Sequence, residues 1–112
     1  MALRLVGSTE VEPEGGVVFY RVTRYEYPEE RYDEIMAWAN TKTDQLRAIN
    51  GLQSVDTFPT GPGESMIIAA YDSEDVFNAA ADTVLALLGE LAGFMTSAPM
   101  TSSGTVDWTT RS

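Results

Sequence analysis

Five side chains of this sequence could bind or act on a small molecule, and they fall in three segments. Tyr20 and Arg21 are neighbours in one apolar stretch, and Tyr71 ends another. Trp38 and Lys42 are four residues apart, so a helix would place them on one face. An Arg can bind a carboxylate or phosphate through paired hydrogen bonds. A Lys among apolar residues can meet an anion or act as a base, and tyrosine phenols can hydrogen-bond an aromatic substrate.

Each candidate also has an ordinary structural explanation. The stem of Lys42 can lie along apolar surface while its ammonium reaches water, and Trp38 can pack at the edge of an apolar stripe. Arg21 can form an ion pair with Glu26 or Asp56, and the tyrosines can be half-buried packing residues. The sequence leaves these alternatives open, so the five side chains are weak candidates for lining a ligand pocket.

Composition excludes several kinds of site and partner. The sequence has no Cys and no His, which removes thiolate ligands, the commonest metal ligand and the commonest general base. We therefore expect no metal site. Acidic residues outnumber basic ones by 17 to 7, for a net charge of −10. Such a surface repels a phosphate backbone and an anionic membrane, so we expect neither nucleic-acid nor membrane partners.

The apolar stretches are too short for a membrane-spanning helix, which needs about 20 consecutive apolar residues. Residues 1–12 also lack the apolar core of a signal peptide. We therefore expect a cytoplasmic location. Residues 1–16 are rich in turn-forming and charged residues and predict an N-terminal extension with a possible short strand at residues 3–6. Residues 17–112 are expected to form a single domain.

The sequence pattern over residues 17–112 predicts strands and helices in alternation. Four segments rich in β-branched and aromatic residues predict strands, at residues 17–25, 52–58, 66–71 and 105–109. Residues 59–63 (Pro-Thr-Gly-Pro-Gly) predict the loop of a hairpin. Two segments with helical apolar spacing predict helices, at residues 28–49 and from Asp72 or Ser73 to Met95. Inside the first helix, the polar residues 40–44 could mark a kink at a ligand or a solvated turn.

This order, βαββαβ, predicts a ferredoxin-like α+β fold with an antiparallel sheet and both helices on one face. The strand at residues 66–71 is apolar on both sides, so the second face of the sheet would be left exposed in an isolated domain. A copy of the same chain, packed sheet against sheet with twofold symmetry, would cover it. We therefore expect a homodimer.

Two junctions resemble those of the dimeric α+β barrel superfamily, which includes antibiotic-biosynthesis-type monooxygenases and stress-responsive barrel proteins. Residues 48–55 (Ala-Ile-Asn-Gly-Leu-Gln-Ser-Val) resemble its PGL-x-S helix end, and residues 71–77 (Tyr-Asp-Ser-Glu-Asp-Val-Phe) resemble its W-x-S-x-E-x-F helix start. Asn50 and Tyr71 stand where proline and tryptophan are usual. The absence of His excludes the haem-degrading members, which use a His ligand.

The resemblance implies two classes of function. One is a cofactor-independent monooxygenase-like enzyme that acts on a bulky apolar or aromatic compound in a pocket between helices and sheet. The other is a non-catalytic dimeric module that binds a metabolite or a protein, which the absence of His and Cys favours. In both cases we expect no cofactor.

Overall fold

The computed structural model describes residues 18–111, in which four strands form one antiparallel sheet. The predicted extension at residues 1–16 lies outside the described residues. The strands run in the spatial order β3-β4-β2-β5. Their bounds are Phe19–Glu26 for β2, Leu52–Gly61 for β3, Glu64–Tyr71 for β4 and Met100–Thr105 for β5.

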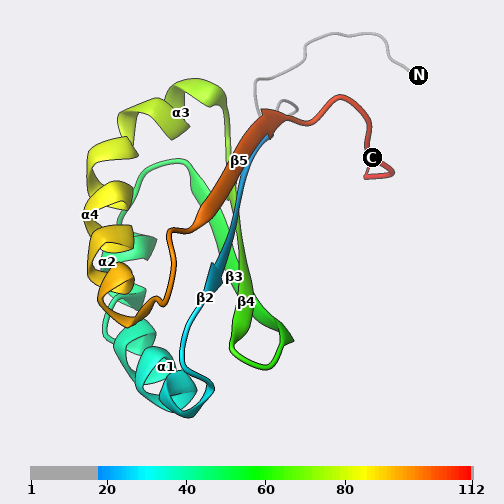
Figure 1. Ribbon diagram of the computed structural model, residues 1–112. Coiled ribbons are helices and arrows are strands. Elements are labelled where there is room, and N and C mark those ends of the chain that lie inside the picture. The colour runs from blue at the N-terminus through cyan, green and yellow to red at the C-terminus, as the bar shows by residue number, and fades with distance from the viewer. Residues whose placement is uncertain (1–17, 112) are drawn as a thin grey trace, which may run out of the picture.

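The helices all lie on one side of this sheet (Figure 1). The first helical region contains the 3-10 turn η2 at Glu29–Arg31, α1 at Tyr32–Asn40 and α2 at Thr43–Arg47. The second contains α3 at Glu74–Ala79, α4 at Ala81–Leu91 and the 3-10 turn η3 at Ala92–Phe94. The chain therefore has the predicted ferredoxin-like α+β architecture. Within the described residues, no helix is both long and apolar enough to cross a bilayer.

Strand β2 is an interior strand of the sheet, and its side chains alternate between the two faces. It pairs with β4 on one edge and with β5 on the other. Every second residue, Phe19, Arg21, Thr23 and Tyr25, is buried, and the residues between them are partly exposed. This alternation is the period of two that a strand imposes on its side chains. The buried set faces the helices, so Arg21 enters the core while Tyr20 lies on the opposite, outer face.

The apolar core between sheet and helices consists of two clusters rather than one. The first contains the buried residues Phe19, Ala69, Tyr71 and Ala80, with Phe77 packed against them. The second contains Tyr25, Tyr27, Ile35 and Leu91. Domains of this size usually bury one continuous core, so the division points to a space between the clusters.

The first helix is interrupted, which corrects the expectation of one helix over residues 28–49. The Thr41 hydroxyl donates to the Trp38 carbonyl over 2.6 Å, and the Thr41 backbone N–H donates to the same oxygen over 3.0 Å. A side-chain hydroxyl that bonds a preceding carbonyl competes with the helical ladder. The polar stretch at residues 40–44 therefore contains a break between α1 and α2, which consists of Thr41 and Lys42.

The strand bounds also differ from the expected ones, by one or two residues at the ends of β2 and β4 and by more in β3 and β5. Strand β3 continues through Pro59 to Gly61, with an irregular register there, so the predicted loop shrinks to two residues. Proline is tolerated at this position because β3 is an edge strand. The last strand occupies Met100–Thr105 instead of 105–109, and the Trp108 side chain is 77 % exposed. The free edge of β2 recruits a Ser- and Thr-rich segment whose own β preference is weak, because pairing partners outweigh local propensity.

Gly51 closes the turn after α2 in a conformation that only glycine adopts easily. Its φ is 83°, and a Cβ placed there would lie 2.6 Å from Val76 Cγ1. We expect Gly51→Ala to lower the free energy of unfolding by about 2 kcal/mol or more, since a left-handed residue costs about 1–2 kcal/mol and the overlap adds to it. Chemical denaturation with urea measures this change.

Gly89→Ala is the matched control for that substitution. Gly89 lies in the interior of α4, and no atom outside its own helical turn lies within 4 Å of the position that an alanine Cβ would take. Alanine in a helix is favoured over glycine by roughly 0.5–1 kcal/mol, so this variant should be more stable than the parent. Equal effects of the two substitutions would contradict the assignment of Gly51 as a conformational requirement.

Candidate functional site

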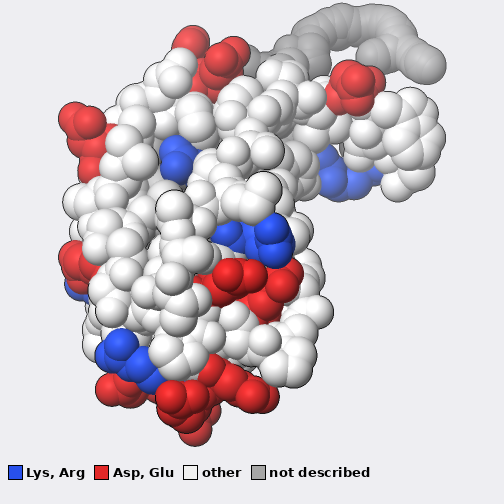
Figure 2. Space-filling model, in the orientation of Figure 1, with Lys and Arg blue, Asp and Glu red and all other residues white. Residues whose placement is uncertain are grey.

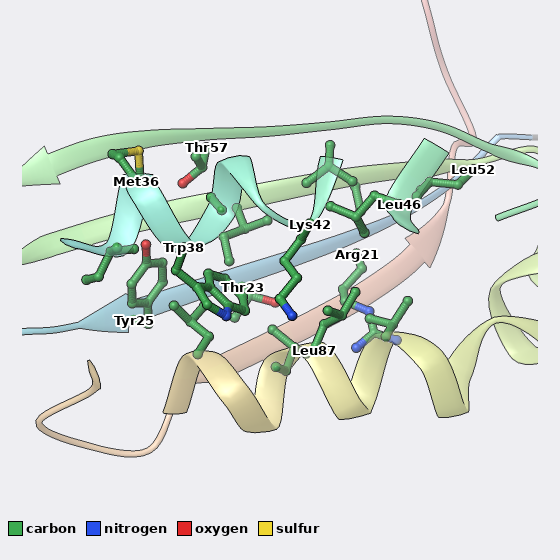
Figure 3. A pocket seen from close by; sticks show the side chains of 18 of the residues that line it. Arg21, Thr23, Tyr25, Met36, Trp38, Lys42, Leu46, Leu52, Thr57 and Leu87 are labelled. Atoms are coloured by element: carbon green, nitrogen blue, oxygen red, sulfur yellow. The ribbon is translucent and has the colours of Figure 1, made fainter. Parts of the chain in front are cut away.

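A cavity of about 130 Å³ lies between the sheet and the helices, in the space that separates the two core clusters. Its wall contains Ala69 and Tyr71 from the first cluster and Tyr25, Ile35 and Leu91 from the second. Most of the other lining side chains are aliphatic. Figure 3 shows Tyr25 and Met36 toward one end, Arg21 and Leu52 toward the other, and Lys42 between them.

The structure brings four of the five candidate residues to this cavity. Arg21, Trp38, Lys42 and Tyr71 all line it. Tyr20 does not, because it lies on the outer face of β2, where its phenol oxygen accepts a 3.4 Å hydrogen bond from Arg111 Nη1. The four residues come from β2, β4, α1 and the break between α1 and α2, so no local sequence motif unites them.

Among residues 18–111, Arg21 is the only buried residue with a charged side chain, and 7 % of its surface is exposed. None of the ion pairs formed among those residues includes it, so the expected pairing with Glu26 or Asp56 is not found. Its Nε atom is buried without a hydrogen-bond partner. The guanidinium instead lies over the Phe77 ring, 4.6 Å from the ring centroid.

An unpaired buried cation is costly for the fold. Even after relaxation, the effective desolvation penalty of a buried ion is several kcal/mol, and a cation–π contact returns about 2 kcal/mol when it is desolvated. Arg21 therefore gains less from its neighbours than its burial costs. Such a residue is typical of a functional position rather than of a packing position.

Tyr71 is the phenol nearest to this cation. Its side chain is 1 % exposed, and burial raises its pKa above the ordinary value of 10.0. The charge and hydrogen-bonding capacity of Arg21 oppose that rise without cancelling it. Tyr71 is therefore neutral at pH 7 and keeps an O–H that can donate to a ligand. Burial likewise raises the pKa of Tyr25, which also lines the cavity.

Glu90 joins Trp38 and Lys42 at the solvent-exposed side of the cavity. Its Oε1 lies 2.8 Å from Lys42 Nζ and accepts a 3.1 Å hydrogen bond from Trp38 Nε1. The bridge connects the α1–α2 break to α4. Sequence reasoning missed Glu90, because it is 52 residues from Trp38 and looks like one of many surface carboxylates. Lys42 thus lines the cavity with its stem and ends in an ion pair.

No carboxylate of the described residues lines the cavity, although the protein is acidic. The acidic side chains visible in Figure 2 lie on the surface, with a dense group at the lower end of the molecule. Among residues 18–111, no group of three or more Asp and Glu side chains is placed to hold a metal ion. The site therefore offers aromatic and aliphatic surface, neutral phenols and one cation that has no counter-ion among residues 18–111.

Comparisons with known proteins bear on the fold alone. No protein-family sequence model and no curated protein sequence matches the chain. A protein of unknown function from Nitrosomonas europaea superposes with a TM-score of 0.70 at 14 % identity, over 88 % of this chain and 97 % of that one. The monooxygenase from the gene ActVA-Orf6 of Streptomyces coelicolor, solved with nanaomycin D, superposes with a TM-score of 0.68 at 18 % identity. The match covers 86 % of this chain and 93 % of that one.

SnoaB, a cofactor-independent oxygenase from Streptomyces nogalater, gives a TM-score of 0.66 at 14 % identity, over 85 % of this chain and 98 % of that one. The chain thus has the ferredoxin-like fold of antibiotic-biosynthesis-type monooxygenases, as the two junctions at residues 48–55 and 71–77 predicted. At these identities the agreement extends to the fold and not to an activity.

The Glu90 bridge should open in acid. A hydrogen bond from Lys42, and to a smaller extent one from Trp38, holds the pKa of Glu90 below its ordinary value of 4.5. A carboxyl with a lowered folded-state pKa stabilises the fold above its unfolded pKa, and this contribution is lost as the pH falls through the lowered value. We expect the fluorescence of Trp38 to change below pH 4.5, measured in a Trp108→Phe background that leaves one indole.

Glu90→Gln is the control for this titration. The amide keeps an oxygen that can accept from Trp38 but has no charge and does not titrate, so the acid fluorescence step should disappear. Circular dichroism at each pH reports whether the helices remain folded through the step. Persistence of the step in Glu90→Gln would assign it to another carboxyl.

Proposed function

We propose that this chain binds a planar apolar or aromatic compound in the cavity and oxidises it as a cofactor-independent, monooxygenase-like enzyme. The observation that supports this most directly is the cavity itself, an apolar space that divides the core and carries a few polar groups at defined positions. Ligand sites in proteins typically combine these two features. An apolar cavity of about 150 Å³ accommodates benzene, so a cavity of about 130 Å³ suits a single aromatic ring.

Larger ring systems would require the cavity to widen. The Glu90 bridge joins the two helical regions through one ion pair and one hydrogen bond, and its release would let α1 and α4 separate. Exposed ion pairs contribute little to stability because water screens them, so the binding of a bulky ligand can readily displace this one. The bridge is therefore the expected entrance for a compound with two or three fused rings.

The chemistry that suits these residues uses the electrons of the substrate itself. An anthrone-type CH₂ carbon loses a proton to form an electron-rich anion, which reacts with O₂. Overall, R₂CH₂ and O₂ give R₂C=O and H₂O, so the substrate supplies all the electrons and no separate reductant is consumed. The side chains would orient the ring, exclude water and stabilise negative charge on the substrate oxygen. The fold supports this proposal because a monooxygenase and a cofactor-independent oxygenase share it.

Filling the cavity tests this proposal. Ala39 lines the cavity from α1, whereas Ala37 in the same helix is exposed. We expect Ala39→Phe to lower kcat/KM for an anthrone- or quinol-type compound by about a hundredfold, because a small displacement of the reacting atoms has that effect. Oxygen uptake together with product absorbance measures turnover, and Ala37→Phe should retain the parent rate.

Trp38→Phe tests the role of the Glu90 bridge in substrate entry. The substitution keeps an aromatic ring but removes the N–H that donates to Glu90. We therefore expect a weaker bridge and a lower KM for compounds with fused rings, because less free energy is needed to displace it. If no anthrone- or quinol-type compound is turned over by the parent protein, the enzymatic proposal is wrong, whatever the variants do.

A non-catalytic ligand-binding module is the second candidate, and it is favoured because the described residues offer no evident general base. No carboxylate of residues 18–111 lines the cavity, burial raises the pKa of both Tyr25 and Tyr71, and Lys42 is engaged by Glu90. A substrate that is not acidic by itself would find no group to take its proton. Tight binding of an aromatic compound without oxygen uptake would support this candidate over the first.

We also propose that the chain assembles as a homodimer through the outer face of the sheet. The strand registers place Val22, Ile68, Phe58 and Met100 on this face. Phe58 is 44 % exposed and Met100 is 62 % exposed. A second copy would bury this apolar surface with the same residues on both sides, as a twofold interface requires.

A charge placed on the outer face should separate the two chains. We expect Ile68→Asp to give the mass of one chain in sedimentation equilibrium at micromolar concentration, because burying an unpaired carboxylate against apolar surface is unfavourable. Leu85→Asp is the control, since Leu85 is 57 % exposed in α4 on the helical side and should leave the dimer intact. A parent protein with the mass of one chain would refute the proposal.

A further inference from the structure

The end of the cavity at Arg21 is built to hold a negative charge that residues 18–111 do not supply. Arg21 projects from β2 toward α4 (Figure 3), and its exposed fraction is 7 %. Its Nε is buried without a hydrogen-bond partner, and no ion pair among residues 18–111 includes the guanidinium. Because Arg stays protonated in proteins, this end of the cavity carries a full positive charge.

Aromatic neighbours keep the guanidinium in place without neutralising it. Arg21 lies 4.6 Å from the centroid of Phe77. The Phe77 ring in turn packs against Phe19 at 4.7 Å and edge-on against Tyr71 at 5.4 Å between centroids. A cation–π contact orients the plane of an Arg but leaves its N–H groups available at the edge. The head group is therefore positioned before any ligand arrives.

Tyr71 adds a second donor beside the cation. Its pKa is raised by burial, so the phenol keeps its proton at neutral pH. A cation and a neutral hydroxyl both donate hydrogen bonds, and together they match an oxygen that carries negative charge. A ligand without an acceptor oxygen would leave the buried Arg21 Nε–H without a partner, and a neutral acceptor would form a weaker hydrogen bond to the cation than a negatively charged oxygen.

We propose that Arg21 and Tyr71 form an anion-binding subsite, and that the ligand of this cavity is an aromatic ring bearing one acidic oxygen group, ionised when bound. The proposal rests on the proposed function in that it needs a ligand in the cavity. The acidic group is a carboxylate or a phenolate, which share the required negatively charged oxygen. A carboxylate is already ionised in solution at neutral pH, whereas a phenol releases its proton to solvent when it binds.

The surface of the protein makes this recognition selective. With a net charge of −10, the chain does not attract anions in general, and its surface charges are screened over about 8 Å at physiological ionic strength. Affinity for an anion must therefore come from short-range contacts inside the cavity. The adjacent apolar wall adds ring burial, so small inorganic anions gain much less than aromatic ones.

Four single-ring probes of nearly equal size separate charge from shape. 4-Nitrobenzoate and 4-nitrobenzamide differ in the charge of one group, and 4-nitrophenol and 4-nitroanisole differ in the ability to ionise. We expect the parent protein to bind 4-nitrobenzoate at least about tenfold more tightly than 4-nitrobenzamide in calorimetric titrations, the ratio typical of a hydrogen bond to a charged group. Binding of 4-nitrophenol should increase its visible phenolate absorbance.

Arg21→Met removes the charge and keeps an unbranched side chain, and Arg47→Met does the same at an exposed position of α2. We expect the first variant to lose the preference for 4-nitrobenzoate and the second to retain it. The unliganded Arg21→Met protein should also have a higher Tm, because an unpaired buried charge is removed. 4-Nitrobenzoate should raise the Tm of the parent protein and leave that of Arg21→Met unchanged.

The possible outcomes separate failure of the anion-binding subsite from failure of ligand binding in the cavity. A charge preference confined to the benzoate pair assigns a carboxylate ligand, and one confined to the phenol pair assigns a phenolate. Equal binding of the charged and neutral probes by the parent protein, or a preference that survives in Arg21→Met, overturns the subsite and leaves the apolar cavity as a binding site. If none of the four probes binds, the cavity is not a ligand site, and both proposals fail.

Discussion

The rest of the structure depends on the double pairing of strand β2. Hydrogen bonds to β4 on one edge and to β5 on the other hold its residues in one register. Because strand side chains alternate strictly, a slip by one residue would exchange the two faces. Arg21 would then move to the outer face and Tyr20 into the core. The position of the buried cation is therefore a consequence of backbone pairing rather than of any favourable contact made by its side chain.

A divided core follows from what this strand buries. Aromatic side chains pack into one cluster around Phe19 and Tyr71 and into another around Tyr25 and Tyr27, and these clusters hold the helices away from the sheet between them. The space left there reduces the packing contacts that a small domain can use for stability. Arg21 adds a further cost at one end of that space. Both features are easier to understand as requirements of a ligand site than as solutions to folding.

The interruption between α1 and α2 connects this space to solvent. An unbroken helix would continue its apolar stripe past the cavity, whereas the Thr41 hydroxyl bonds the Trp38 carbonyl, α1 ends at Asn40 and α2 begins at Thr43. Trp38 and Lys42 then meet Glu90 of α4 in a polar bridge. Two helical regions are thus joined at the surface by charge and hydrogen bonding, which a ligand can displace more easily than it can displace apolar packing.

The sequence by itself determined the order of elements, the alternation of β2 and the glycine turn at Gly51, because each depends on local spacing or on one residue's backbone freedom. It also identified the polar stretch at residues 40–44 as a possible kink or turn. Tertiary structure alone decided that β5 begins at Met100, because the free edge of β2 outweighs weak local propensity. It also decided that Arg21 has no counter-ion among the described residues and that Glu90 meets Trp38, since contacts between distant segments leave no periodic signal in the chain.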